Sequence, residues 1–141
     1  MQYDELLNSG KIHREKVSRQ EINRALTRAE RDLKAADKIL NQDWDWCFAI
    51  AYNAVLQASR AYMFAQGYRP SSSEGHKNTL AFMRIAMAKE HEELILYFDR
   101  MRVKRNQAIY DLAGMVSETE AKNLLSKSTQ FVRLIKRKLS K

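Results

Sequence analysis

The sequence predicts an all-α protein, an up-and-down antiparallel bundle of four long helices plus one shorter helix. Its 141 residues include only 4 Gly and 1 Pro, the two residue types that interrupt helices most strongly. Hydrophobic residues make up 45% of the chain and charged residues 30%, a balance that suits helices with one buried face. Apolar residues also recur at spacings of three and four along several long segments, which is the helical period.

Residues 1–17 are expected to be an N-terminal extension of a single domain that spans residues 1–141. They contain a short helical stretch, YDELL, followed by a break at Asn8-Ser9-Gly10 and a charged connector. A chain of this length buries roughly two-thirds of its unfolded surface, which is enough for one core. No second core and no β-sheet are expected.

The first two long helices are bounded by clear signals. Ser18 and Glu21 form a capping box that predicts a helix over about 19–40, and Asn41-Gln42-Asp43 interrupts it. A second helix is expected from Trp44 to about residue 66, before the stop GYRP. We expect this helix to be central and buried because apolar residues nearly surround it: Trp44, Cys47, Ala51, Val55, Ala58 and Tyr62 on one face, and Trp46, Leu56 and Phe64 elsewhere.

Three further helices follow. Serines at 71–73 are expected to cap a third, shorter helix that runs to about residue 88. A fourth is expected over about 90–113, and a second capping box, Ser117 with Glu120, predicts the last helix. The connections between these segments are short, which implies antiparallel neighbours.

Charge and composition limit the classes of function. Lys and Arg number 25 against 17 Asp and Glu, a net charge of +8. This excess suits nucleic acid, a nucleotide or an acidic protein as partner, although positive charge also simply keeps a protein soluble. The sequence has neither a signal-peptide pattern nor an apolar run long enough to span a membrane, so we expect a soluble cytoplasmic protein.

Metal and cofactor chemistry is not expected. The three histidines lie in three separate segments, and Cys47 is the one cysteine, so the spacing of a zinc site is missing. Glycine patterns that bind nucleotide phosphates are also missing. The sequence therefore predicts no metal site and no cofactor.

Polar residues interrupt the apolar faces of two helices. Asn53, Gln57 and Arg60 form a stripe on the second helix, at positions i, i+4 and i+7. This stripe is either partly exposed or a polar seam, buried within the bundle or at a subunit interface. On the fourth helix, an arginine occupies the inward seam, which runs through Leu94, Phe98, Met101, Arg105, Ala108 and Leu112.

Arg105 has two explanations. In the structural explanation, its aliphatic stem packs in the bundle, and its guanidinium either pairs with a carboxylate or reaches solvent at the bundle edge. In the functional explanation, Arg105 faces a cleft that receives phosphate. The second is favoured by Arg102, Asn106 and Tyr110, which form an adjacent ridge. His76 is expected in the first turn of the third helix, where it is either solvated or part of an anion site.

The second to fourth helices resemble the HEPN family, named for higher eukaryotic and prokaryotic nucleotide binding. The resembling stretches are AYNAVLQASRAYMFAQGYRP, SSSEGHKNTL and RMRVKRNQAIYD. Many HEPN proteins are metal-independent endoribonucleases, with a signature of Arg, commonly a polar residue, and then His, displayed at a homodimer cleft. Arg105 and Asn106 match the opening of this signature, and Tyr110 stands in the His position, as in a subgroup that lacks the standard motif.

The resemblance implies a protein that binds RNA or nucleotide, with toxin-like endoribonuclease activity in a toxin–antitoxin or defence pair. Family members are often encoded beside a minimal nucleotidyltransferase, so it also implies a homodimer and such an antitoxin partner. The alternative is a non-catalytic module that binds a nucleotidyltransferase or another protein. The expected site has a catalytic group and a binding group: Arg105, Asn106 and Tyr110 in the first, and Arg102, Arg60 and His76 in the second.

Overall fold

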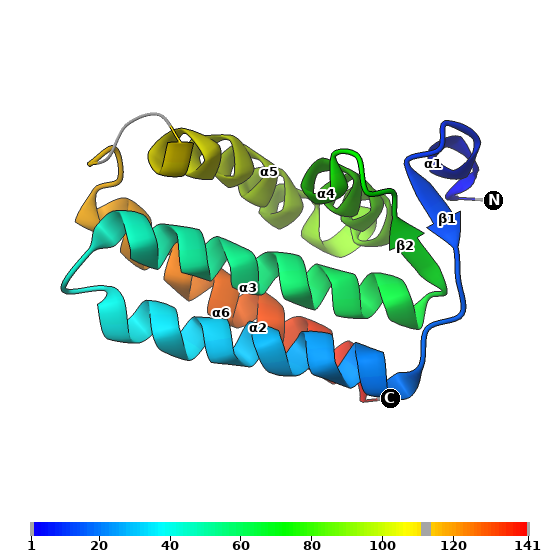
Figure 1. Cartoon of the computed structure of the whole chain (residues 1–141), viewed down its shortest axis with the longest axis horizontal. Helices are drawn as coiled ribbons and strands as arrows, with labels where there is room; N and C mark the ends of the chain where they lie inside the picture. Colours follow the sequence, from blue (N-terminus) through cyan, green and yellow to red (C-terminus); the bar gives the residue numbers. More distant parts are fainter. Residues whose placement is uncertain (1, 111–113, 141) are drawn as a thin grey trace.

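The computed structural model describes residues 2–110 and 114–140, and for residues 108–110 it describes the backbone alone. The elements in chain order are α1 (Asp4–Asn8), β1 (Ile12–Arg14), α2 (Arg19–Ile39), α3 (Trp44–Ala65), β2 (Tyr68–Pro70), α4 (Gly75–Ala86), α5 (Ala88–Tyr110) and α6 (Glu118–Leu139). The long helices α2, α3, α5 and α6 run up and down beside the shorter α4 (Figure 1), so the predicted helical bundle is confirmed. Within the described residues, no helix has both the length and the apolar character needed to cross a membrane.

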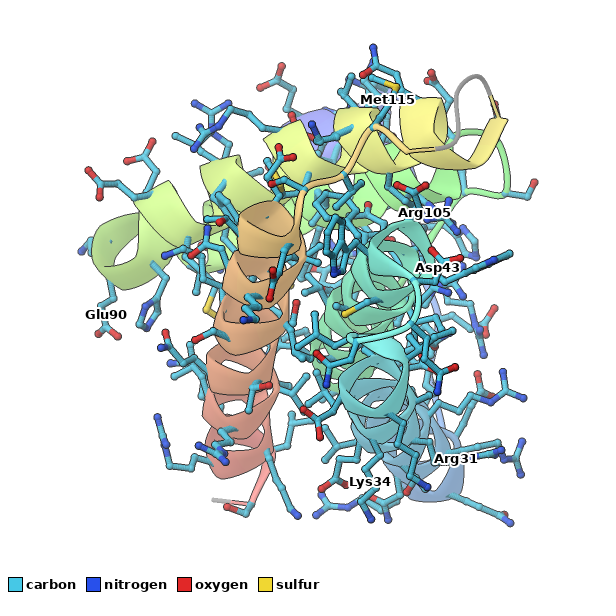
Figure 2. The ribbon with its side chains drawn as sticks, turned by 90° about the vertical axis from the view of Figure 1, so that its left-hand side faces the viewer. Arg31, Lys34, Asp43, Glu90, Arg105 and Met115 are labelled. Carbon is cyan, nitrogen blue, oxygen red and sulfur yellow. The ribbon has the colours of Figure 1, made fainter. Side chains whose placement is uncertain are left out.

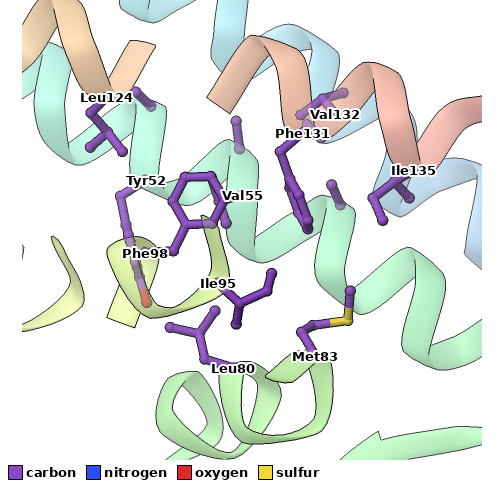
Figure 3. Close-up of a cluster of buried hydrophobic side chains, with 14 of the residues drawn as sticks. Tyr52, Val55, Leu80, Met83, Ile95, Phe98, Leu124, Phe131, Val132 and Ile135 are labelled. Atoms are coloured by element: carbon purple, nitrogen blue, oxygen red, sulfur yellow. The ribbon is translucent and has the colours of Figure 1, made fainter. Parts of the chain in front are cut away.

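The central position of α3 is also confirmed. This helix packs against α2, α4, α5 and α6, and most of its side chains are buried. Figure 3 shows part of the core, where Tyr52 and Val55 of α3 meet side chains from α4, α5 and α6. Trp44 and Trp46 differ from the prediction, since they are 44% and 54% exposed. They lie in the first turn of α3, at the end of the bundle.

Helix starts agree with the predicted caps at α2 and α6. The Ser18 hydroxyl accepts a hydrogen bond from the Glu21 N–H, and Ser117 and Glu120 form the complete capping box. The predicted serine cap of the third helix is wrong. The N-cap of α4 is Glu74, whose backbone is left-handed with φ 54°.

The N-terminal segment contains a short antiparallel strand pair, which corrects the expectation that no sheet would form. Ile12 of β1 lies opposite Pro70 of β2, and the Ser71 N–H extends the pairing. This pairing engages one of the serines that were expected to cap α4. Tyr3 stacks on Phe82 with ring centres 4.3 Å apart, so residues before α2 cover one end of the core. Strand pairing between distant tripeptides has no local sequence period, which explains the missed prediction.

Candidate functional site

Arg105 lies where α5 meets α3. Two turns earlier on α5, Phe98 is fully buried, and the same face of the helix carries Arg105 toward α3. The Arg105 Nη2 donates a hydrogen bond to Asn53 Oδ1 at 3.3 Å, and its guanidinium carbon lies 5.6 Å from the centre of the Tyr52 ring. Figure 2 shows Arg105 at this junction.

The structure leaves both sequence explanations of Arg105 open. The side chain is half-buried, and its Nε is enclosed without a hydrogen-bond partner among the described residues. Within that part of the chain, no carboxylate comes within ion-pair distance of its guanidinium. Arg105 is therefore packed like a structural residue but keeps its charge available to an anion.

The predicted binding residues Arg60, His76 and Arg102 gather around Arg105. Arg60 Nη2 lies beside Gly75, 4.0 Å from the position that a β-carbon on this glycine would occupy. The next residue, His76, has its ring centre 6.2 Å from that of Tyr52. Burial is the main cause that lowers the pKa of His76, and Arg105, Arg60 and Arg102 lower it further. Arginines of α3 and α5 thus lie within electrostatic range of one imidazole on α4.

The lowered pKa keeps the His76 imidazole neutral at pH 7, because its ordinary value is already about 6.5. A neutral imidazole has one donor nitrogen and one acceptor nitrogen. Because the three arginines oppose protonation, an anion that offsets their charge would raise the pKa of His76. Ligand binding and protonation are therefore coupled in this cluster.

The other predicted residues differ in their surroundings. Arg102 Nε pairs with Asp99 Oδ1 at 3.1 Å, so a carboxylate already offsets part of its charge. Asn106 lies on the exposed side of α5. The side chain of Tyr110 lies outside the described part of the structure. The cluster within the described residues therefore consists of Arg60, His76, Arg102 and Arg105.

Tyr52 lies beside the cluster, against Arg105 and His76, and sequence reasoning missed it. It is fully buried, and its hydroxyl has no hydrogen-bond partner within the described residues. Burial raises the pKa of this phenol, and the nearby Arg102 and Arg105 oppose the shift. The available signal was a tyrosine beside alanines in a central helix, since a buried hydroxyl needs a partner.

The predicted polar stripe of α3 lines a groove beside α2. Asn53 and Gln57 are half-buried and border a hollow of about 630 Å³ together with Arg28 and Arg31. A smaller hollow of about 250 Å³ adjoins it, and Arg60 forms part of its lining. Arg60 Nε is enclosed without a partner among the described residues, and burial is the main cause that lowers the pKa of Arg60. The stripe is thus the partly exposed floor of a groove.

The arrangement suits anion binding more than any other chemistry. Two guanidinium groups, of Arg60 and Arg105, offer donors in a fixed planar geometry that matches phosphate oxygens. The nearby His76 adds a donor or an acceptor. In the described part of the chain, no three His, Cys, Asp or Glu side chains gather in a way that could hold a metal ion.

Comparison with known families gives one match. The model of the family described as the HEPN domain matches residues 22–138, which is most of the chain. The match begins within α2 and ends within α6, so it includes Arg60, His76, Arg102 and Arg105. A search of curated proteins finds no match.

Proposed function

Because the chain belongs to the HEPN domain family, we propose that it binds RNA or nucleotide through the cluster around Arg105. The observation that carries this proposal is the half-buried Arg105 guanidinium, which has an amide and an aromatic ring as neighbours and no carboxylate within ion-pair distance in the described residues. A buried charge without a counter-ion is unfavourable. A phosphate would supply the missing charge and two parallel hydrogen bonds.

Each residue of the cluster has a role in this proposal. Arg105 holds a phosphate, and Arg60 of α3 contributes a second guanidinium, which lies beside Gly75 at the start of α4. His76 donates a hydrogen bond to a phosphate oxygen or a ribose hydroxyl. Arg102 adds long-range attraction while it remains paired with Asp99. Asn106 orients the ligand from the exposed side of α5.

Metal-independent cleavage of RNA is a second candidate function. It is favoured by the neutral His76 imidazole, which the arginines surround and which can accept the proton of a ribose 2′-hydroxyl. By its position in the sequence, Tyr110 takes the place of the His in the family signature. Its ordinary pKa of about 10 makes it a weak base near neutral pH, so we expect slow cleavage.

The proposed context is a toxin–antitoxin or defence pair in which the protein acts as a homodimer. Two copies would place their Arg105 clusters along one shared cleft. A minimal nucleotidyltransferase encoded nearby would be the antitoxin. The alternative is a non-catalytic module whose cluster binds such a protein, and it predicts tight binding to the partner without binding of RNA.

The test is calorimetric titration of purified protein with AMP and with a short single-stranded RNA. We expect both ligands to bind, and Arg105→Ala to lose most of the affinity for each. Arg133→Ala is the matched control, since Arg133 is an exposed arginine on α6. Binding of neither ligand by the wild-type protein would exclude the proposal. Light scattering of the same samples measures the oligomeric state.

A further inference from the structure

The groove between α2 and α3 continues the candidate site along the bundle. Its two hollows share Arg28 and Gln57 in their linings, so they form one channel. Asn53 lines this channel and also accepts the hydrogen bond from Arg105. The α2–α3 groove therefore borders the Arg105 cluster at Asn53.

Cations follow one side of this groove along α2. Five exposed basic residues border it: Arg24, Arg28, Arg31, Lys34 and Lys38. Figure 2 shows Arg31 and Lys34 on this helix. None of the five forms an ion pair within the described residues.

The acidic residues of the groove do little to offset this charge. Glu21 is already paired with Arg69. Asp32 lines the larger hollow together with four basic residues, Arg28, Arg31, Lys34 and Lys38. The groove thus keeps a net positive charge along its length, which favours a polyanion over a neutral or basic partner.

The length of the charged row is informative. Arg24 and Lys38 are fourteen positions apart on one helix, which corresponds to about 21 Å at about 1.5 Å per residue. A stacked nucleic acid strand advances about 3.4 Å per nucleotide, so the row matches about six nucleotides. A single nucleotide at Arg105 would leave most of these cations unused.

Trp46 supplies an exposed aromatic surface on the face of α3 that also carries the groove residues Asn53 and Gln57. The positions 46, 50, 53, 57 and 60 follow one face of α3, so Trp46 lies in line with Asn53, Gln57 and Arg60. Its side chain is 54% exposed, which leaves the indole accessible to a ligand. A charged groove with exposed aromatic rings is the usual design of sites for single-stranded nucleic acid.

We propose that the α2–α3 groove binds single-stranded RNA that extends from the Arg105 cluster, with the α2 cations on phosphates and Trp46 stacked on a base. This inference rests on the proposed function and specifies its ligand as an oligonucleotide of about six or more nucleotides. It explains why the basic row, the polar stripe and the exposed indole lie along one channel.

The experiment compares a ten-nucleotide oligouridylate with UMP by titration at several KCl concentrations. We expect the oligonucleotide to bind at least 100-fold tighter than UMP. The triple variant Arg31→Gln/Lys34→Gln/Lys38→Gln should lower the slope of log affinity against log salt by about 2, at about 0.7 per phosphate contact. Its affinity for UMP should stay unchanged, because UMP binds at Arg105.

Tryptophan variants test the stacking separately. We expect Trp46→Ala to weaken oligonucleotide binding about tenfold or more. Trp44→Ala is the control: Trp44 is 44% exposed but faces the opposite side of α3. Equal losses in the two variants, or none in either, would contradict stacking on Trp46.

Three outcomes overturn the inference. Equal affinity of the wild-type protein for the oligonucleotide and UMP would show that the groove adds no contacts. An unchanged salt slope in the triple variant would show that the α2 cations do not touch phosphates. Conversion of a dimer to a monomer by the triple variant, with RNA affinity intact, would assign the groove to a second copy of the chain. Provided Arg105→Ala still weakens UMP binding, each outcome leaves the proposed function intact.

Discussion

Arg105 of α5 donates a hydrogen bond to Asn53 of α3, with 3.3 Å between Nη2 and Oδ1. The acceptor is a neutral amide, so this contact fixes the guanidinium without cancelling its charge. An aspartate at the same position would have made an ordinary structural ion pair. Because Asn53 is an amide and not a carboxylate, Arg105 keeps a charge that an anion could pair with. A variant at Asn53 tests this directly.

Asn53→Asp places a carboxylate beside Arg105 with almost no change in side-chain size. We expect affinity for AMP and for short RNA to fall at least tenfold, because the carboxylate competes with phosphate for the same donors. Asn123→Asp, on an exposed position of α6, is the control for one added negative charge. Equal affinities of the two variants would show that the contact with Asn53 is unrelated to binding.

His76 should couple binding to pH. Its pKa is lowered by burial and by the three arginines, and a bound phosphate offsets their charge and raises it again. Binding then takes up protons, so affinity should rise as pH falls from about 6.5 toward the pKa of the free protein. An NMR titration of His76 with and without inorganic phosphate measures both values. If phosphate left this pKa unmoved, the anion would not bind beside His76.

The same shift predicts the pH dependence of folding at this residue. The folded protein holds the His76 proton less tightly than the unfolded chain, whose ordinary pKa is about 6.5. The contribution of His76 to stability is therefore constant above that pH and decreases as pH falls below it. His76→Asn should flatten both this dependence and the pH dependence of ligand affinity.

A substitution at Phe98 tests the packing of α5, the helix that positions Arg105. It is fully buried and meets the Phe131 ring edge to face, with ring centres 5.2 Å apart. We expect Phe98→Ala to lower the free energy of unfolding by about 3–5 kcal/mol in urea denaturation. Val103→Ala on the same helix is 48% exposed in the wild type and should change it by about 0.5 kcal/mol or less. A loss below about 1 kcal/mol for Phe98→Ala would contradict the packing of α5 on α6.

The fold was predictable wherever the signals are local. Ser18 and Ser117 stand next to the helices that they cap, and the apolar residues that nearly surround α3 identified it as the central helix. The pairing of β1 with β2 depends on contacts between distant residues, and it also removed Ser71 from the expected cap. The start of α4 at Glu74 follows from a backbone conformation that residue type does not reveal.

The sequence pointed to the arginines and the histidine of the candidate cluster but not to Tyr52, and the function of this cluster stays a prediction. Arg105 stood out as a charge in an apolar seam, and Arg102 as its neighbour on the same helix. Arg60 stood out in the polar stripe of α3, and His76 in the first turn of a helix. Tyr52 was missed because a tyrosine in a buried helix looks like ordinary core. The pairing of Arg105 with Asn53 is a contact between residues 52 positions apart, so helix periodicity alone could not show it.

Tyr110→His tests whether the cluster cleaves RNA. A histidine in this position restores the closing residue of the family signature, and general acid–base catalysis is typically worth about 10²–10⁴-fold in rate. We expect slow cleavage by the wild-type protein and at least a tenfold faster rate in the variant, measured on a denaturing gel. Absence of cleavage in both proteins would limit the function to binding.

The central claim is that Arg105 is the phosphate-binding residue, and its most direct test is the affinity of Arg105→Ala for short single-stranded RNA. A lost charge-assisted contact is worth about 1.5–3 kcal/mol, so affinity should fall at least tenfold, with a smaller loss in Arg105→Lys and none in the control Arg133→Ala. Far-UV circular dichroism confirms that each variant is folded. RNA affinity unchanged by Arg105→Ala in a folded protein would contradict the claim and leave Arg105 as a packed structural residue.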